Sequence, residues 1–317
     1  MNLLPASPDR QSWLPLWIGT WSMSGLGWGA TDERQGRQTL ELAWEHGIRH
    51  FDTAGFYGRG AADRLIARTL ASVRPATFIS AKGGLRWVGA KVEHRADPRS
   101  IREDLYRSLD ALRTDYIDMF SLHWPDPKVG LQDSIGALLD LQAEGLIRQP
   151  GVCNLSQQQI RAWCPPGGTL PHQVAFSPWR APTELEAGMA EERCCNLVIS
   201  PFEHGLLLPR AAPPGRKEFR SRHPLLQSSR ATNLLTRLHN LDRLRRPGAV
   251  ARAILAWIQA RRDVHAVIAG PRRPDQLAAL LDPFHLPAEE TAVFDDLMAA
   301  LQQTGAAAIS SKSARIN

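Results

Sequence analysis

The sequence lacks the features that mark membrane, secreted and metal-binding proteins. No run approaches the roughly 18 consecutive apolar residues of a membrane span, and residues 1–15 have no basic start followed by an apolar stretch, so we expect no secretion signal. Only four cysteines occur in 317 residues, without a C-x-x-C pair. We interpret them as free thiols in a reducing compartment, which predicts a cytoplasmic protein, and we predict no metal site. They are Cys153, Cys164, Cys194 and Cys195.

Glycine-rich nucleotide motifs are absent as well. Neither G-x-G-x-x-G nor G-x-x-x-x-G-K-[ST] occurs, which removes the commonest signature of Rossmann and P-loop sites. Nucleotide binding is not excluded, because a barrel can hold phosphates with loop backbone and helix N-termini at its top face.

The composition is that of a globular protein with a basic surface. Hydrophobic residues make up 43% and charged residues 22%, and the formal net charge is +6. The densest basic cluster, Arg243, Arg245 and Arg246, is more typical of a solvated helix face than of a nucleic-acid groove. We therefore expect no nucleic-acid partner, and the positive charge also suits an anionic small ligand. A nucleic-acid-binding protein stays an alternative, and it predicts affinity with a steep salt dependence.

Eight short β-type runs recur along the chain, and most are followed by an amphipathic helical pattern. This alternation favours a parallel sheet, and eight units in about 300 residues favour a single (β/α)₈ barrel spanning 1–317. The strand-like runs lie at 15–20, 48–54, 77–82, 115–123, 147–154, 172–177, 196–201 and 265–270, and the helical patterns at 37–47, 100–113, 134–145, 249–262 and 275–281.

Three segments depart from this simple rhythm. Pro150 falls inside the fifth run, where a strand between two neighbours needs its N–H. The basic, proline-containing segment 208–247 predicts a long loop, and loops of that length are usually functional. Residues 303–317 are small and polar, so we expect a flexible tail there.

Polar residues stand where several predicted strands end. Asp52, Lys82 and His123 close the second, third and fourth runs, and Tyr57 follows five residues after Asp52. In a barrel these ends meet at the active-site face. A cation beside Tyr57 is expected to lower its pKa from about 10, so that the phenol can give a proton to a carbonyl oxygen that gains negative charge. His123 can orient the same oxygen, and the hydride must come from a cofactor.

Eight segments in this order resemble the aldo-keto reductases along nearly the whole chain. The resemblance implies a TIM barrel that reduces an aldehyde or ketone, with Tyr57 as general acid, Lys82 and Asp52 tuning it, and His123 orienting the carbonyl. The segments are IGTWSMSGLGWG (18–29), FDTAGFYG (51–58), FISAKGG (78–84), LHWPDP (122–127), GVCNLS (151–156), QVAFSP (173–178), SPFEHGLL (200–207) and GPRRPDQL (270–277).

The resemblance also implies a set of cofactor contacts. The nicotinamide side is contacted by Thr20, Asp52, Asn154 and Gln173, and the ring of Phe176 stacks on the nicotinamide. Backbone near the pyrophosphate comes from Phe202, Gly205 and Leu206. The groups at the adenosine end are Gly270, Arg272, Arg273 and Gln276. Two arginines at the adenosine 2′-phosphate favour NADPH (NADP+) over NADH. In the resemblance, the segment KEFRSRHPLL (217–226) corresponds to a loop that folds over the cofactor.

Four aromatic residues are expected at the barrel mouth: Trp21, Phe56, Trp87 and Trp124. They predict a small-molecule carbonyl substrate with an apolar or ring-shaped body. Many barrels of this kind are monomers, which is our expectation here. A nicotinamide-binding regulatory barrel that docks to a partner without turnover stays open as an alternative.

Overall fold

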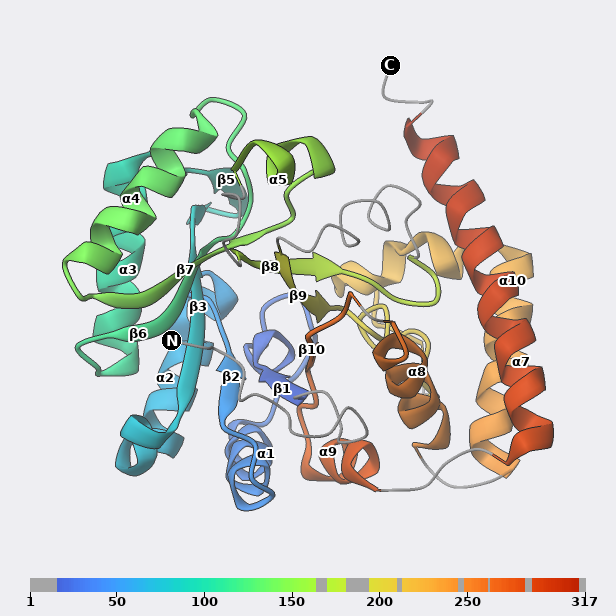
Figure 1. Cartoon of the computed structure of the whole chain (residues 1–317). Helices are drawn as coiled ribbons and strands as arrows, with labels where there is room; N and C mark the ends of the chain where they lie inside the picture. Colours follow the sequence, from blue (N-terminus) through green and yellow to red (C-terminus); the bar gives the residue numbers. More distant parts are fainter. Residues whose placement is uncertain are drawn as a thin grey trace.

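The architecture was examined in a computed structural model, which describes residues 16–163, 170–180, 194–209, 213–244, 248–261, 263–282 and 287–313. Eight parallel strands close into a barrel in the order β1-β10-β9-β8-β7-β6-β3-β2 (Figure 1). They are β1 (Leu16–Gly19), β2 (His50–Asp52), β3 (Phe78–Gly83), β6 (Ile117–Leu122), β7 (Ile147–Cys153), β8 (Leu170–Ala175), β9 (Cys194–Ile199) and β10 (Ala266–Ala269).

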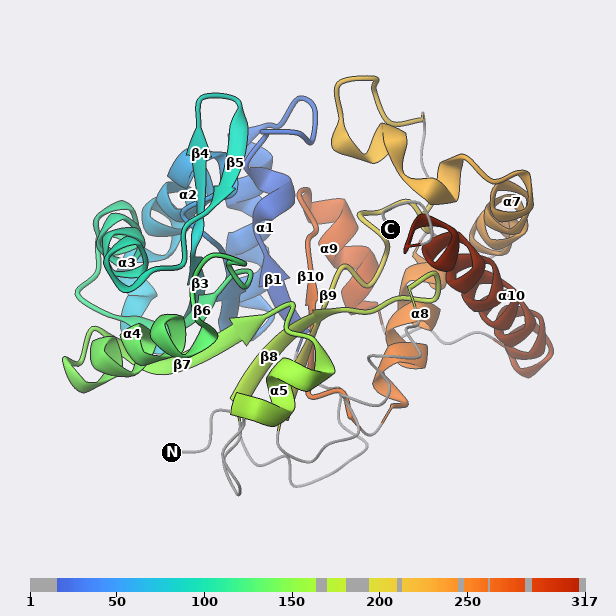
Figure 2. The same cartoon turned by 90° about the horizontal axis from the view of Figure 1, so that it is seen from above.

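Helices surround this ring on the outside (Figure 2). The described α-helices are α1 (Glu33–Glu45), α2 (Ala61–Leu70), α3 (Pro98–Leu112), α4 (Leu131–Ala143), α5 (Gln157–Trp163), α7 (Ser229–Leu244), α8 (Ala249–Gln259), α9 (Pro274–Leu281) and α10 (Ala288–Ser313). Short 3₁₀ helices lie at η1 (Trp21–Met23), η2 (Tyr57–Gly60), η3 (Ala71–Ala76), η4 (Phe219–Arg222) and η5 (Pro224–Leu226). The predicted (β/α)₈ barrel is confirmed, and each of the eight predicted strand runs overlaps a barrel strand.

Helix starts follow local chemistry. At α3 the Asp97 carboxylate accepts from the Ser100 N–H at 3.0 Å, and Pro98 occupies the first turn, where no N–H is needed. At α1 the Asp32 side chain accepts from the N–H groups of Arg34 and Gln35. These caps fix where each helix leaves its preceding loop.

The barrel interior is filled by apolar side chains that meet across the ring. Trp17 of β1, Leu197 of β9 and Ile268 of β10 come from three adjacent strands, and Met119 of β6, a strand next to none of these, belongs to the same buried cluster, which only an interior position allows. Two larger clusters pack the outer faces of the strands against the helices. Because apolar side chains fill the barrel interior, polar side chains can meet only at the C-terminal ends of the strands.

Pro150 is accommodated because β7 is paired unevenly. Pro150 stands opposite Phe120 of β6, whereas the register of β7 with β8 begins at Val152. The missing N–H therefore falls where the β8 side of the ladder has not yet started.

The chain after residue 208 holds more helix than the sequence predicts. Within the segment 208–247, Ser229–Leu244 forms α7, which includes Arg243; residues 210–212 and 245–247, with Arg245 and Arg246, lie outside the described residues. Of the segment 303–317, for which the sequence predicts a flexible tail, the residues as far as Ser313 belong to α10. α10 lies beside α7 (Figures 1 and 2) and buries Leu297 and Leu301. Residues 314–317 lie outside the described part.

Candidate active site

The four predicted catalytic side chains meet at one end of the barrel. Lys82 Nζ donates to both Asp52 carboxylate oxygens, at 2.8 and 2.7 Å, and to the Thr53 carbonyl at 2.9 Å. The same nitrogen lies 3.3 Å from the Tyr57 hydroxyl. Asp52 and Lys82 are each only 3% exposed. The amine is thus held between a carboxylate and a phenol, away from bulk water.

Strand geometry explains why Lys82 and Asp52 meet. β2 and β3 are neighbours, with Asp52 opposite Ser80, and side chains two residues apart on a strand share a face. Ser80 and Lys82 therefore point the same way, and Ser80 Oγ donates to Asp52 Oδ1 at 2.9 Å. Sequence reasoning missed Ser80, although its spacing of two from Lys82 was the signal that could have found it.

Gln173 belongs to the same buried network. Its Nε2 donates to Asp52 Oδ1 at 2.7 Å and lies 3.2 Å from Ser80 Oγ, while Cys153 Sγ lies 3.7 Å from its Oε1. Asp52 is therefore fixed by three donors, Lys82, Ser80 and Gln173. The carboxylate is held in one orientation under the amine.

The environment keeps the Tyr57 phenol protonated. Complete burial raises the pKa of Tyr57 to about 12, and the opposing effect of the Lys82 charge is smaller. The expectation of a pKa below 10 is wrong, because burial outweighs the charge of Lys82 and the Asp52 carboxylate raises the pKa of Tyr57 further. Burial is the largest single effect on the pKa of Lys82 and lowers it, but the Asp52 carboxylate, together with Tyr57 and Cys153, raises it, and the balance lies above its usual value. The site thus presents a neutral phenol beside a permanent cation.

His123 follows the end of β6 and faces the tyrosine. Its ring makes an edge contact with the Tyr57 ring at 5.8 Å between centroids. Burial, and next the charge of Lys82, hold the pKa of His123 well below 6.5, so the imidazole is neutral near pH 7. Its Nδ1 is buried and has no hydrogen-bond partner among the described residues. A neutral imidazole can orient a carbonyl oxygen without competing for the proton.

Three of the four predicted mouth aromatics pack around this centre. Trp21 stacks with Tyr57 at 5.8 Å, and Phe56 stacks with Trp87 at 4.9 Å and 3°. The Trp87 indole N–H also donates to the Phe56 carbonyl at 3.1 Å. Trp124 is 43% exposed, and its ring makes an edge contact with His94 at 6.4 Å. Trp21, Phe56 and Trp87 are called the aromatic wall below.

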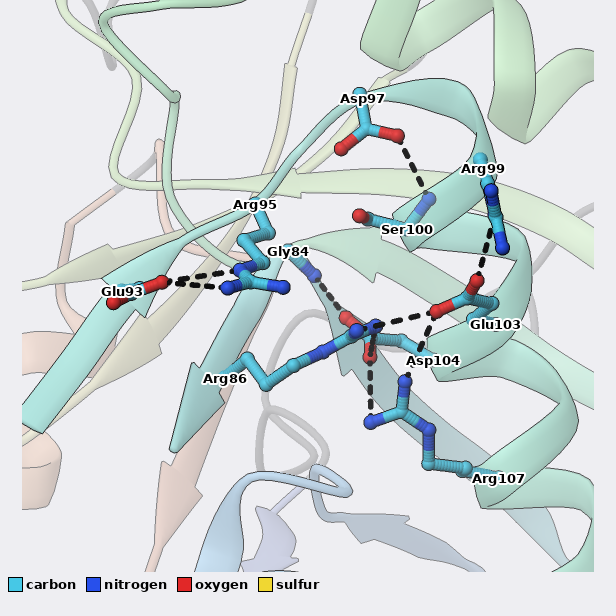
Figure 3. A network of polar contacts seen from close by, with 10 residues as sticks. All are labelled: Gly84, Arg86, Glu93, Arg95, Asp97, Arg99, Ser100, Glu103, Asp104 and Arg107. Carbon is cyan, nitrogen blue, oxygen red and sulfur yellow. Dashed lines mark hydrogen bonds and ion pairs between the residues drawn. The ribbon is translucent and has the colours of Figure 1, made fainter. Parts of the chain in front are cut away.

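Trp87 is carried by an antiparallel hairpin, β4 (Leu85–Val88) and β5 (Lys91–His94), which the sequence reasoning missed. Arg86 of β4 pairs with Asp104 at 3.1 Å and with Glu103 at 3.2 Å, both on α3, as Figure 3 shows. The Gly84 N–H donates to the other Asp104 oxygen at 2.9 Å. These contacts anchor the base of the hairpin to the barrel and so position Trp87.

Comparison with known proteins agrees with this geometry. A model of the aldo/keto reductase family matches residues 15–299. The chain belongs to the aldo/keto reductase family. It is 29% identical over 278 residues to aldo-keto reductase YhdN of Bacillus subtilis (strain 168), covering 83% of this chain and 82% of that protein. It is also 27% identical over 283 residues to the NADH-specific methylglyoxal reductase of Escherichia coli (strain K12), covering 82% and 86%.

Among solved structures, a glycerol dehydrogenase from Gluconobacter oxydans superposes with a TM-score of 0.75 at 27% identity, covering 90% of this chain and 91% of that one. As an aldo-keto reductase, the protein is an oxidoreductase that uses a nicotinamide cofactor and acts on small carbonyl compounds. No helix within the described residues could cross a membrane.

The residues predicted to contact the nicotinamide side lie in and beside this network. Thr20 Oγ1 donates to the Asp52 carbonyl at 3.0 Å, and Asn154 Nδ2 donates to the His123 carbonyl at 3.0 Å. Asn154 is partly exposed, and it adopts a left-handed backbone with φ of 58°. Its Oδ1 accepts no hydrogen bond from the described residues, so it is available to a carboxamide. Gln173, by contrast, has its amide hydrogens on Asp52 and Ser80.

The structure places Phe176, the residue predicted to stack on nicotinamide, away from the side chains around Tyr57. Phe176 is fully buried and stacks on Trp257 of α8 at 5.5 Å, so its ring lies in the layer between barrel and helices. The reason is the two-residue period of β8: Gln173 points inward, and Phe176, three residues on, points outward. The inward side chain near the end of the neighbouring β9 is Ile199, which packs on the interior cluster.

The residues predicted for the phosphate side of the cofactor lie on the loops after β9 and β10. Ser200, Glu203 and His204 have positive φ, as does Gly205, so the loop that includes Phe202 and Leu206 turns tightly. Those two side chains are buried, which leaves backbone groups to approach a ligand. At Gly270 the carbonyl accepts from Ser22 Oγ at 2.9 Å, so the β10 loop is tied to the β1 loop.

The guanidinium groups at this rim fit an anionic cofactor. Burial lowers the pKa of Arg272, and the nearby charges of Arg220 and Arg273 lower it further. Arg272 donates to the Trp28 carbonyl at 3.2 Å, and its backbone N–H donates to Gln276 Oε1 at 3.0 Å. Arg273 pairs with Asp275 at 2.9 Å. Cations that destabilise one another gain free energy when a phosphate binds between them.

Proposed function

We propose that this protein reduces an aldehyde or ketone that carries an apolar or ring-shaped body, with NADPH as the cofactor and Tyr57 as the proton donor. The observation that carries the proposal is the contact of the Tyr57 hydroxyl with Lys82 Nζ at 3.3 Å above the Asp52 carboxylate. The aromatic wall beside Tyr57 supports an apolar substrate body.

When bound, the nicotinamide supplies the hydride. Tyr57 donates its proton to the carbonyl oxygen as that oxygen becomes an alkoxide, and Lys82 stabilises the phenolate left behind. His123, being neutral, hydrogen-bonds the same oxygen and fixes the direction of the carbonyl. Asp52 keeps Lys82 charged inside a buried site. The same groups run in reverse for alcohol oxidation.

The direct test measures turnover of a panel of aromatic, aliphatic and sugar aldehydes, and the loss of NADPH absorbance is the readout. We expect the aromatic aldehydes to give the highest kcat/KM. Carbonyl-independent NADPH binding without turnover of any panel member would instead support a regulatory barrel.

The preference for NADPH is supported by the clustered charges of Arg220, Arg272 and Arg273. Arg272→Gln is expected to raise the KM for NADPH about tenfold, as loss of a charged hydrogen bond does, with little change for NADH. Arg37→Gln, which removes an exposed charge from α1, is the matched control. Equal effects of Arg272→Gln on both cofactors would contradict a 2′-phosphate contact.

A cytoplasmic monomer is part of the same proposal. Cys153, Cys194 and Cys195 are buried free thiols, as suits a reducing compartment. The exposed large apolar side chains lie mostly around the mouth, on the β1, β3, β6 and β9 loops; they are Leu26, Val88, Val92, Trp124 and Phe219. The others stand singly on outer helices, so no dimer face is evident among the described helices. Sedimentation at two protein concentrations tests the monomer, and a concentration-dependent shift would contradict it.

A further inference from the structure

The segment 213–226, which carries η4 and η5, is docked on the loop after β1. The Phe219 N–H donates to the Gly27 carbonyl at 3.2 Å. The Phe219 ring stacks with Trp21 at 5.1 Å and 14°, and meets Trp28 edge-on at 5.0 Å. His204 of the β9 loop makes a further edge contact with Phe219 at 5.1 Å. One side chain of this segment thus touches the loops after both β1 and β9.

Trp21 connects Phe219 to the catalytic centre. The same indole that stacks with Phe219 also stacks with Tyr57, at 5.8 Å and 19°. Tyr57 in turn contacts Lys82. A row of aromatic contacts therefore runs from an exposed segment of the chain, where Phe219 is 39% exposed, to the buried proton donor.

Charged contacts hold the segment in this docked position. Arg220 lies over the Trp28 ring at 5.1 Å, donates to the His204 carbonyl at 3.0 Å, and pairs with Glu218. Farther along, His223 Nε2 lies 2.9 Å from Glu203, a fully buried carboxylate that also accepts from Ser177 Oγ. Residues on both sides of Phe219 are therefore fixed, which orients its ring toward Trp21.

We propose that Phe219 is a positioning residue: it holds the Trp21 indole against Tyr57, so that docking of segment 213–226 sets the shape of the substrate side of the site. This proposal rests on the proposed function, since Trp21 belongs to the aromatic wall. If Phe219 positions Trp21, then Phe219 controls the selectivity of the site for carbonyl substrates that carry a ring. This role is separate from any contribution of segment 213–226 to cofactor binding. Without the Phe219 ring, Trp21 gains rotational freedom and must be ordered again by each substrate.

The test compares Phe219→Ala with Phe219→Trp, using Leu139→Ala as the control because Leu139 is an exposed apolar residue on α4. We expect Phe219→Ala to raise the KM for an aromatic aldehyde about three- to tenfold, the worth of one aromatic pair. The KM for a two- or three-carbon aldehyde, kcat and the NADPH dissociation constant should change less than about twofold on the same argument. Phe219→Trp should restore the KM, and Leu139→Ala should match the wild type.

A second measurement does not depend on turnover. The near-ultraviolet circular dichroism of the cofactor-free protein reports the packing of Trp21 and Trp28, whose rings lie 5.2 Å apart at 88°. Phe219→Ala should change this signal, with far-ultraviolet signal and melting temperature close to the wild type.

The outcomes separate the two proposals. Weaker NADPH binding with an unchanged aldehyde KM would overturn the positioning role and leave Phe219 as part of a cofactor cover. Unchanged kinetics and an unchanged near-ultraviolet signal would overturn it as well. No turnover in the wild type, together with the expected spectral change, would overturn the proposed function and retain the coupling of Phe219 to Trp21.

Discussion

The Lys82–Asp52 ion pair is buried, so forming it requires removing two charges from water. Two charges removed from water are tolerated only when each is fully paired. Here the carboxylate accepts from Lys82, Ser80 and Gln173, and the amine also reaches the Thr53 carbonyl. The pair keeps a cation beside Tyr57 whatever the solvent pH near neutrality. Function and stability are therefore linked at these two residues.

Removing one partner of this pair should destabilise the fold. Asp52→Asn leaves the Lys82 charge buried without its carboxylate, and we expect a loss of about 3–5 kcal/mol in the free energy of unfolding, measured with urea. The double variant Asp52→Asn/Lys82→Met should be more stable than Asp52→Asn alone. A double variant less stable than either single variant would contradict this view of the pair.

The meeting of the candidate catalytic residues could be predicted from the sequence because they are polar groups at or just after strand ends, and that position is set by the strand pattern. Phe176 could not be placed by resemblance alone: the two-residue period of β8, counted from Gln173, turns its ring outward. The raised pKa of Tyr57 also lay beyond the sequence, since it depends on how fully the phenol is buried. Burial is a property of the folded neighbours and not of the motif.

The β4–β5 hairpin illustrates how a small element can tune the substrate side of a barrel. Arg86 ties the hairpin to α3 through ion pairs with Asp104 and Glu103. In Figure 3, Arg95 forms an ion pair with Glu93 of the hairpin and none with α3. The Arg59 side chain reaches the hairpin turn at the Gly89 carbonyl, 2.6 Å away. The hairpin thus holds Trp87 through contacts at both of its ends.

Loosening this anchor should affect substrate binding more than chemistry. Arg86→Met removes the charge but keeps the stem, and we expect the aromatic-aldehyde KM to rise about three- to tenfold with kcat nearly unchanged. Limited proteolysis should show faster cleavage within residues 85–94. Arg95→Met is the matched control, because it removes a hairpin charge that does not reach α3. If both variants behave alike, the anchor does not position Trp87.

Strand β8 contains a pH-sensitive contribution to stability. His172 is fully buried, and burial lowers its pKa to about 4. A histidine in the unfolded chain titrates near pH 6.5. Below that pH the unfolded chain binds a proton at His172, whereas the buried imidazole of the folded protein does not. The stability from neutral His172 is therefore complete above about pH 6.5 and is lost as the pH falls to about 4. The loss corresponds to about 3 kcal/mol.

His172→Leu should remove this pH dependence. The measurement is the difference in unfolding free energy between wild type and variant at several pH values from about 7 to 4. Between about pH 7 and pH 4 we expect the unfolding free energy of the variant to rise relative to that of the wild type by up to about 3 kcal/mol. A difference that stays constant with pH would show that His172 protonates without cost.

Most elements that sequence reasoning found have a regular apolar period, although α2, which buries Leu65, Ile66 and Leu70, was missed. The β4–β5 hairpin has short, partly exposed strands, so its residues carry no apolar alternation to detect. The end of α10 reads as a polar tail, yet it is helical because its preceding turns bury Leu297 and Leu301. Tertiary contact, which no local pattern encodes, decides both cases.

Closure of the barrel is what gathers the site from distant parts of the chain. Gln173 and Asp52 are 121 residues apart and hydrogen-bonded, and Ser22 and Gly270 are 248 apart. At one rim the charges of Arg220 and Arg273 lie close enough to Arg272 to lower its pKa, although Arg220 pairs with Glu218 and Arg273 with Asp275. A basic molecule with an apolar mouth suits an anionic cofactor and an uncharged carbonyl substrate.

The most direct measurement is kcat for carbonyl reduction by Tyr57→Phe, taken together with the NADPH dissociation constant of the same variant. If the Tyr57 hydroxyl donates the proton, kcat falls by a factor of about 10² to 10⁴ while NADPH binding stays near the wild-type value. A Tyr57→Phe enzyme that keeps most of its kcat would show that the proton comes from another group and that the assignment of Tyr57 is wrong.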